Sequence, residues 1–129
     1  MRVLFLSLLF LASPAVAGPG PAALAALDLI NAARADHGCP PLRLDARLTA
    51  AAERQSRSMA RAHILSHTDP DGSTPAARVR AAGYVYLMVG ENITANSDDP
   101  RDAVATWMNS PGHRANILTC AYRETGIAV

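Results

Sequence analysis

Apolar residues recur at helical spacing in the first part of the chain after a short leader-like segment. Leu24, Leu27 and Ile30 repeat every three residues, and the pattern stops before Gly38. Side chains three and four residues apart share one face of a helix, and glycine is typical of helix ends. This pattern predicts a helix over residues 22–36.

A second amphipathic helix is predicted from Asp45, a residue suited to accept hydrogen bonds from free backbone N–H groups at a helix start. It should end near His63. Its arginines lie largely off one inward face, formed by Leu48, Ala51, Ala52, Gln55, Met59 and Ala62. Three shorter helices are predicted where a capping residue precedes proline, at Thr74-Pro75, Asp99-Pro100 and Ser110-Pro111. Of these, the first should close at Gly83 and the last should run through Leu118.

Two segments have the composition of β-strands. Residues 84–89 are rich in aromatic and β-branched side chains, and residues 125–129 form an apolar stretch near the end of the chain. Helices and strands in this order lack regular βαβ alternation. The pattern therefore predicts an α+β domain with helices packed on a small, mostly antiparallel sheet.

The first 17 residues have the features of an export signal. Arg2 precedes an apolar run, and Ala15-Val16-Ala17 resembles a small-residue cleavage site. The run is shorter than the roughly 20 apolar residues that span a bilayer, so we expect no transmembrane segment after cleavage. The predicted organisation is a signal peptide at 1–17, a linker at 18–21 and one domain at 22–129, in a protein that is secreted or held in the cell envelope.

Charge argues against one class of partner. The chain has 12 basic and 11 acidic residues, and cleavage after Ala17 would remove one of the basic ones. A balanced charge gives no general attraction to polyanions, so we expect no nucleic-acid partner.

Cys39 and Cys120 are the only cysteines. Export favours a disulfide between them, and the alternative is a pair of buried free thiols.

Candidate chemistry lies at His67, His113 and Glu91. Both histidines sit at turn-rich junctions, and Glu91 directly follows an apolar segment. A carboxylate there is costly to desolvate unless a histidine or a cation pairs with it. Two imidazoles and a carboxylate could hold a divalent cation such as zinc, or could form a hydrogen-bonded cluster that only holds loops together. No cofactor is required by the pattern.

Several familiar catalytic motifs are missing. His63 and His67 are four residues apart, but the glutamate of the HExxH zinc-protease motif is not between them. The sequence also lacks a GxSxG elbow, a phosphate-binding P-loop and a CxxC pair. Ser110 is better interpreted as a helix cap than as a nucleophile, and no catalytic residue is assigned.

Three ordered motifs resemble the CAP superfamily of cysteine-rich secretory proteins, antigen 5 and pathogenesis-related proteins, in particular its bacterial SCP-domain branch. They are SHT at 66–68, GENI at 90–93 and WMNSPGHRANIL at 107–118. The resemblance implies secretion and a three-layer αβα sandwich. It also implies a cleft to which His67, Glu91 and His113 contribute, with Asn92 and Ser110 beside them.

The sequence departs from the family pattern at two places. A second glutamate of the eukaryotic members would fall at Ser110, so a triad remains in place of a tetrad. Family members also continue beyond the strand that resembles 126–129, so the sheet is expected to lack its last strand. The positions of Cys39 and Cys120 resemble a disulfide of bacterial members.

Two functions follow as hypotheses. The first is a secreted binding or envelope and host-interaction module whose cleft holds a divalent cation, a lipid-like molecule or another envelope component, with His67 and His113 as the metal ligands. The second is a peptidase-like hydrolase that uses His67, Glu91 and His113 for acid–base chemistry. A purely structural role for the three residues remains open beside them.

Overall fold

The computed structural model describes residues 18–129, and the predicted signal peptide lies outside the described residues. The chain forms five helices and two short strands in the order α1, β1, α2, α3, α4, α5, β2 within this range. Helix α1 spans Pro21–Asp36, α2 Ala46–Ala62, α3 Pro75–Ala81, α4 Pro100–Met108 and α5 Pro111–Ile117. No helix in residues 18–129 is long and apolar enough to cross a membrane.

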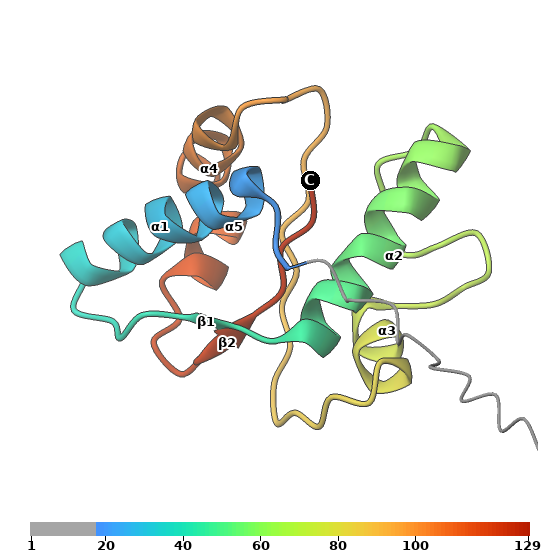
Figure 1. Cartoon of the computed structure of the whole chain (residues 1–129), viewed down its shortest axis with the longest axis horizontal. Helices are drawn as coiled ribbons and strands as arrows, with labels where there is room; N and C mark the ends of the chain where they lie inside the picture. Colours follow the sequence, from blue (N-terminus) through green and yellow to red (C-terminus); the bar gives the residue numbers. More distant parts are fainter. Residues whose placement is uncertain (1–17) are drawn as a thin grey trace, which may run out of the picture.

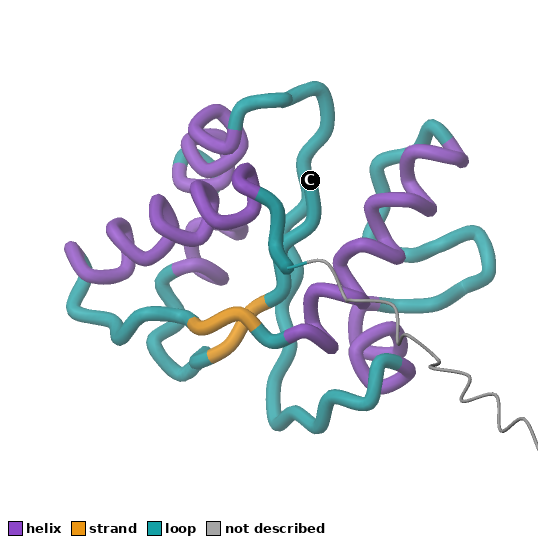
Figure 2. The backbone as a smooth tube through the Cα atoms, in the orientation of Figure 1, coloured by secondary structure: helices purple, strands orange, loops and turns teal. Residues whose placement is uncertain are grey.

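The helices form two groups on either side of a central layer of extended chain (Figure 1). Helices α1, α4 and α5 pack together on one side, and α2 packs with α3 on the other. Between them lie the strands β1, Arg43–Leu44, and β2, Glu124–Thr125, with long segments that have no regular structure (Figure 2). This arrangement confirms the predicted layered α+β fold.

The apolar core belongs to one of the two groups. Ala26 and Ile30 of α1 pack with Val104 of α4 and Ile117 of α5, and Trp107 is half-buried against them. Of the three apolar residues whose spacing predicted helix α1, only Ile30 is buried, whereas Leu24 is 44% exposed and the alanines Ala23 and Ala26 face the core in its place. By contrast, the largest fully buried side chains include two arginines and a glutamine, Arg34, Arg78 and Gln55.

Helix boundaries follow the capping residues closely. The Asp45 side chain accepts hydrogen bonds from the backbone N–H groups of Arg47 and Leu48, and Thr74 accepts one from Ala77. His63 ends α2 in the left-handed conformation, with φ of 53°. The first helix begins at Pro21, one residue earlier than predicted, because proline fits the first helical position. Ser110 occupies the N-cap position of α5 without a side-chain capping bond, so its predicted capping bond is wrong.

The strand predictions were less accurate. Residues 84–89 form no regular strand. Of the second predicted strand, 125–129, only Thr125 belongs to β2, which spans Glu124–Thr125. Pairing between β1 and β2 is parallel, with Arg43 opposite Glu124, whereas a mostly antiparallel sheet was predicted. A strand forms only where a partner supplies hydrogen bonds, and composition alone does not reveal that partner.

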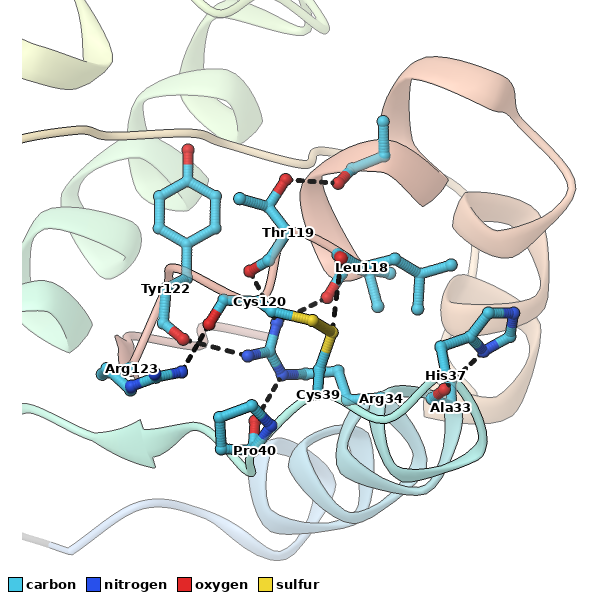
Figure 3. Close-up of a disulfide and its surroundings, with 12 residues drawn as sticks. Ala33, Arg34, His37, Cys39, Pro40, Leu118, Thr119, Cys120, Tyr122 and Arg123 are labelled. Carbon is cyan, nitrogen blue, oxygen red and sulfur yellow. Dashed lines mark hydrogen bonds between the residues drawn. A yellow bond between two sulfur atoms is a disulfide. The ribbon is translucent and has the colours of Figure 1, made fainter.

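A disulfide joins the end of α1 to the segment after α5. Cys39 and Cys120 are bonded, with their Cα atoms 4.8 Å apart, which confirms the predicted pairing over free thiols. The guanidinium of Arg34 lies beside the disulfide (Figure 3). It donates hydrogen bonds to the carbonyl oxygens of Pro40, Ile117, Thr119 and Tyr122. The same two segments are therefore held by a covalent bond and a hydrogen-bond network.

Candidate functional site

His67 and Glu91 form the centre of the candidate site, as the sequence predicts. His67 Nδ1 lies 2.8 Å from Glu91 Oε1, and the imidazole is about half exposed, at 51% of its side-chain surface. Glu91 is mostly buried. A buried carboxylate requires hydrogen-bonding or charged partners, and the imidazole supplies one of them.

The loop that carries His67 is fixed to α2. The chain turns at His63, and the side-chain amide of Gln55 on α2 donates a hydrogen bond to the carbonyl of Ser66. The Ser66 hydroxyl also bonds the backbone of Thr68 on the other side of the histidine. These contacts hold the residues on both sides of the exposed imidazole.

The segment that carries Glu91 is fixed to α4 and α5. Trp107 Nε1 donates to the carbonyl of Ile93 at 3.2 Å, and Asn116 Nδ2 donates to Asn92 Oδ1 at 2.9 Å. Gly90 approaches α5 and the segment after it closely, since a Cβ atom there would lie 2.8 Å from Tyr122 Oη and 3.2 Å from Asn116 Oδ1. Only glycine fits this approach without a shift of the tyrosine.

His113 is joined to the site through the backbone. Its carbonyl accepts a hydrogen bond from Asn92 Nδ2 at 3.0 Å, which places the start of α5 next to the Glu91 segment. The ring atom Nδ1 of His113 is buried and lacks a hydrogen-bond partner among the described residues. Ser110, three residues earlier, is partly exposed at the start of α5.

Arg78 is the site residue that sequence reasoning missed. Its side chain is only 1% exposed, and Nη2 lies 2.8 Å from Glu91 Oε2. The same guanidinium forms an ion pair with Asp69, at 3.6 Å between Nη1 and Oδ2. Nothing in the spacing of α3 distinguishes Arg78 from the exposed Arg80 two residues later, so no sequence signal pointed to it.

The arrangement does not match a three-ligand metal site. Within residues 18–129, no group of three or more histidine, cysteine, aspartate or glutamate residues is placed to hold a metal ion. Both oxygens of Glu91 are already engaged, one with His67 and the other with Arg78. A fixed positive charge next to the carboxylate disfavours a second cation there. Zinc binding by His67 and His113 alone stays a prediction.

Two cavities lie on α2 near its C-terminal end, separate from the histidine and glutamate pair. One, of about 270 Å³, is lined by residues that include Ser66 and Thr68. The other, of about 640 Å³, lies between α2 and residues 94–96. The residues that line these two cavities do not include His67, Glu91 or His113.

The chain is similar in sequence to several known proteins. A model of the cysteine-rich secretory protein family, abbreviated CAP, matches residues 27–129. The uncharacterized protein YkwD of Bacillus subtilis is 34% identical over 101 residues, 78% of this chain and 39% of that protein. The uncharacterized membrane protein YlbC of the same organism is 32% identical over 103 residues, 80% of this chain and 30% of that protein. The chain thus spans less than half the length of these curated relatives.

Solved structures show the same fold. An extracellular protein containing an SCP domain from Bacillus anthracis superimposes with a TM-score of 0.79 and 31% identity, covering 82% of this chain and 36% of that one. An outer surface protein from Borrelia burgdorferi gives a TM-score of 0.62 at 21% identity, with coverage of 78% of this chain and 74% of that one. The second likeness supports the fold alone.

Proposed function

Because this chain belongs to the cysteine-rich secretory protein family, we propose that it acts outside the cell as a binding module whose site is built on His67, Glu91 and His113. The predicted export signal and the extracellular SCP-domain protein with the same fold support this location. The ligand is a divalent cation, a lipid-like molecule or another component of the cell envelope, bound without turnover.

One observation carries this proposal. The exposed imidazole of His67 is held by a mostly buried carboxylate, and that carboxylate is held by a fully buried arginine. Burying charged groups in this way costs desolvation energy. The attraction between the opposite charges offsets that cost only when their distances and hydrogen bonds are favourable. A surface histidine with so much support presents a group in a fixed position, as a binding site requires.

Peptidase-like hydrolysis is the second candidate, and the 2.8 Å contact between His67 Nδ1 and Glu91 favours it. Histidine general bases are often held in this way: a carboxylate accepts a hydrogen bond from one ring nitrogen, and the other ring nitrogen faces the reacting group. In that mechanism, His67 Nε2 would take a proton from a water or a substrate hydroxyl. Loss of peptidase or esterase turnover in His67→Ala, with turnover kept in His63→Ala, would establish this alternative in place of a binding module.

The experiment for the binding proposal is calorimetric titration with two probes, zinc chloride and a short-chain phospholipid kept below its micelle concentration. We expect at least one probe to bind, and its affinity to fall at least tenfold in His67→Ala and in His113→Ala. His37→Ala and His63→Ala are matched controls, since both residues are exposed helix-end histidines away from the Glu91 contact. Absence of binding by both probes, or equal loss in the controls, would overturn the proposal.

A further inference from the structure

Arg78 of α3 lies at the centre of the charged residues beneath His67. It is one of the most deeply buried side chains of the described chain, and it lies between two carboxylates, those of Asp69 and Glu91. Asp69 is itself held by the hydroxyl of Ser73, with 2.9 Å between Ser73 Oγ and Asp69 Oδ2. The buried positive charge is therefore fully paired.

One nitrogen of this guanidinium connects both parts of the His67 unit. Arg78 Nη2 donates to the backbone carbonyl of His67 at 3.0 Å and to Glu91 Oε2 at 2.8 Å. The other terminal nitrogen donates to the carbonyl of Ser73 at 2.9 Å. The backbone of the histidine and the carboxylate that holds its ring are thus fixed to one planar guanidinium. Its second terminal nitrogen reaches Ser73 at the same time, a fork that the single nitrogen of lysine lacks.

We propose that Arg78 is a positioning residue that sets which nitrogen of His67 faces the ligand. The inference rests on the proposed function only in taking His67 as the binding group. Arg78 holds Glu91 Oε2, so Oε1 is left for the imidazole. An ionised carboxylate accepts hydrogen bonds and cannot donate them, so His67 Nδ1 must carry the proton.

The ligand class follows from this assignment. With the proton of the neutral ring on Nδ1, the nitrogen left for a ligand is Nε2, which carries a lone pair. Half of the His67 side chain is exposed, so this lone pair is accessible. This lone pair accepts a hydrogen bond from a hydroxyl or an amide N–H, and it can equally bind a cation such as zinc.

Replacing Arg78 itself is a poor test, because it would leave two buried carboxylates without their cation and the protein could fail to fold. Glu91→Gln is sharper. The introduced amide has one oxygen and one NH2 group, and a charged donor attracts the oxygen more strongly than a neutral imidazole does. Arg78 would therefore take the oxygen, and the NH2 group would face His67 Nδ1.

The readout is the tautomer of His67 in the ligand-free protein, measured from ring ¹⁵N chemical shifts at a pH where the ring is neutral. We expect the proton on Nδ1 in the wild-type protein and on Nε2 in Glu91→Gln. Asp69→Asn is the matched control, because it makes the same change at the other carboxylate partner of Arg78, and we expect the wild-type tautomer there. Backbone amide spectra establish that each variant is folded.

Three results would overturn the proposal: a wild-type ring protonated on Nε2, a Glu91→Gln variant that keeps the proton on Nδ1, or the same switch in Asp69→Asn. None of them depends on a ligand. Failure of this inference is therefore distinguishable from failure of the binding function, which the calorimetric titration tests separately.

Discussion

Gly126 lies directly against the backbone of Leu48 in the first turn of α2. A Cβ atom built on Gly126 would lie 2.0 Å from the carbonyl carbon of Leu48 and 2.1 Å from the nitrogen of Thr49. Real side chains do not approach backbone atoms so closely, so the absence of a side chain at Gly126 lets the end of the chain pass α2. This contact joins the segment after β2 to α2, which belongs to the helix group on the other side from α1, α4 and α5.

Gly126→Ala is therefore expected to destabilise the protein. The new methyl group meets backbone atoms that cannot rotate away, and overpacking of this kind costs about 1–3 kcal/mol in the free energy of unfolding. Gly112→Ala is the matched control, because nothing lies within 4 Å of a Cβ at that glycine. Urea denaturation measures the stability of both variants. A Gly126→Ala midpoint equal to that of Gly112→Ala would contradict the close packing.

The disulfide between Cys39 and Cys120 should contribute a large share of the stability. It closes a loop across 81 residues of sequence, and in the chain-entropy model a loop of this length is worth about 4–5 kcal/mol. We expect a clearly lower urea midpoint after reduction. A variant with both cysteines replaced by alanine should have that low midpoint with or without reductant, and identical midpoints for the oxidised and reduced protein would refute the expectation.

Arg34 and the disulfide should be energetically coupled, since both join the end of α1 to the segment after α5. Arg34→Met removes the donor for four carbonyl groups, and we expect a loss of at least about 3 kcal/mol. Once the disulfide is also removed, the segment after α5 separates more easily, so the combined loss should be smaller than the sum by about 0.5–3 kcal/mol. Denaturation of the four proteins of a double-mutant cycle measures this difference, and strict additivity would argue against coupling.

Features of the fold that depend on neighbouring residues could be predicted from the sequence, whereas features that depend on contacts between distant segments could not. The start of α2 at Asp45 depends on hydrogen bonds to the next few residues, so the sequence pattern predicted it correctly. A strand over 84–89 was predicted from residue types and is wrong. Val85 and Leu87 are instead fully exposed, because β-branched and aromatic composition does not supply the partner strand that a sheet requires.

The candidate site shows the same division. His67 was chosen because it lies in a turn-rich junction, and Glu91 because it directly follows an apolar segment. The structure brings the two side chains into contact. Arg78 was missed since its burial depends on the positions of Asp69 and Glu91, which lie 9 and 13 residues away. A charged residue in a short helix is usually exposed, so only the folded structure identifies it as part of the site.

The acid stability of the protein should depend on Asp45. Hydrogen bonding to Arg47 lowers the pKa of Asp45 from 3.8 to about 2. A carboxyl group whose pKa is lower in the folded state stabilises the protein above the unfolded pKa, and this contribution is lost as the pH falls. We therefore expect a loss of stability between about pH 4 and pH 2 that Asp45→Asn reduces, since asparagine keeps the helix cap without a titratable group. Urea midpoints measured across this range, with Asp28→Asn at an exposed position of α1 as control, test the expectation. An acid dependence unchanged in Asp45→Asn would show that another group is responsible.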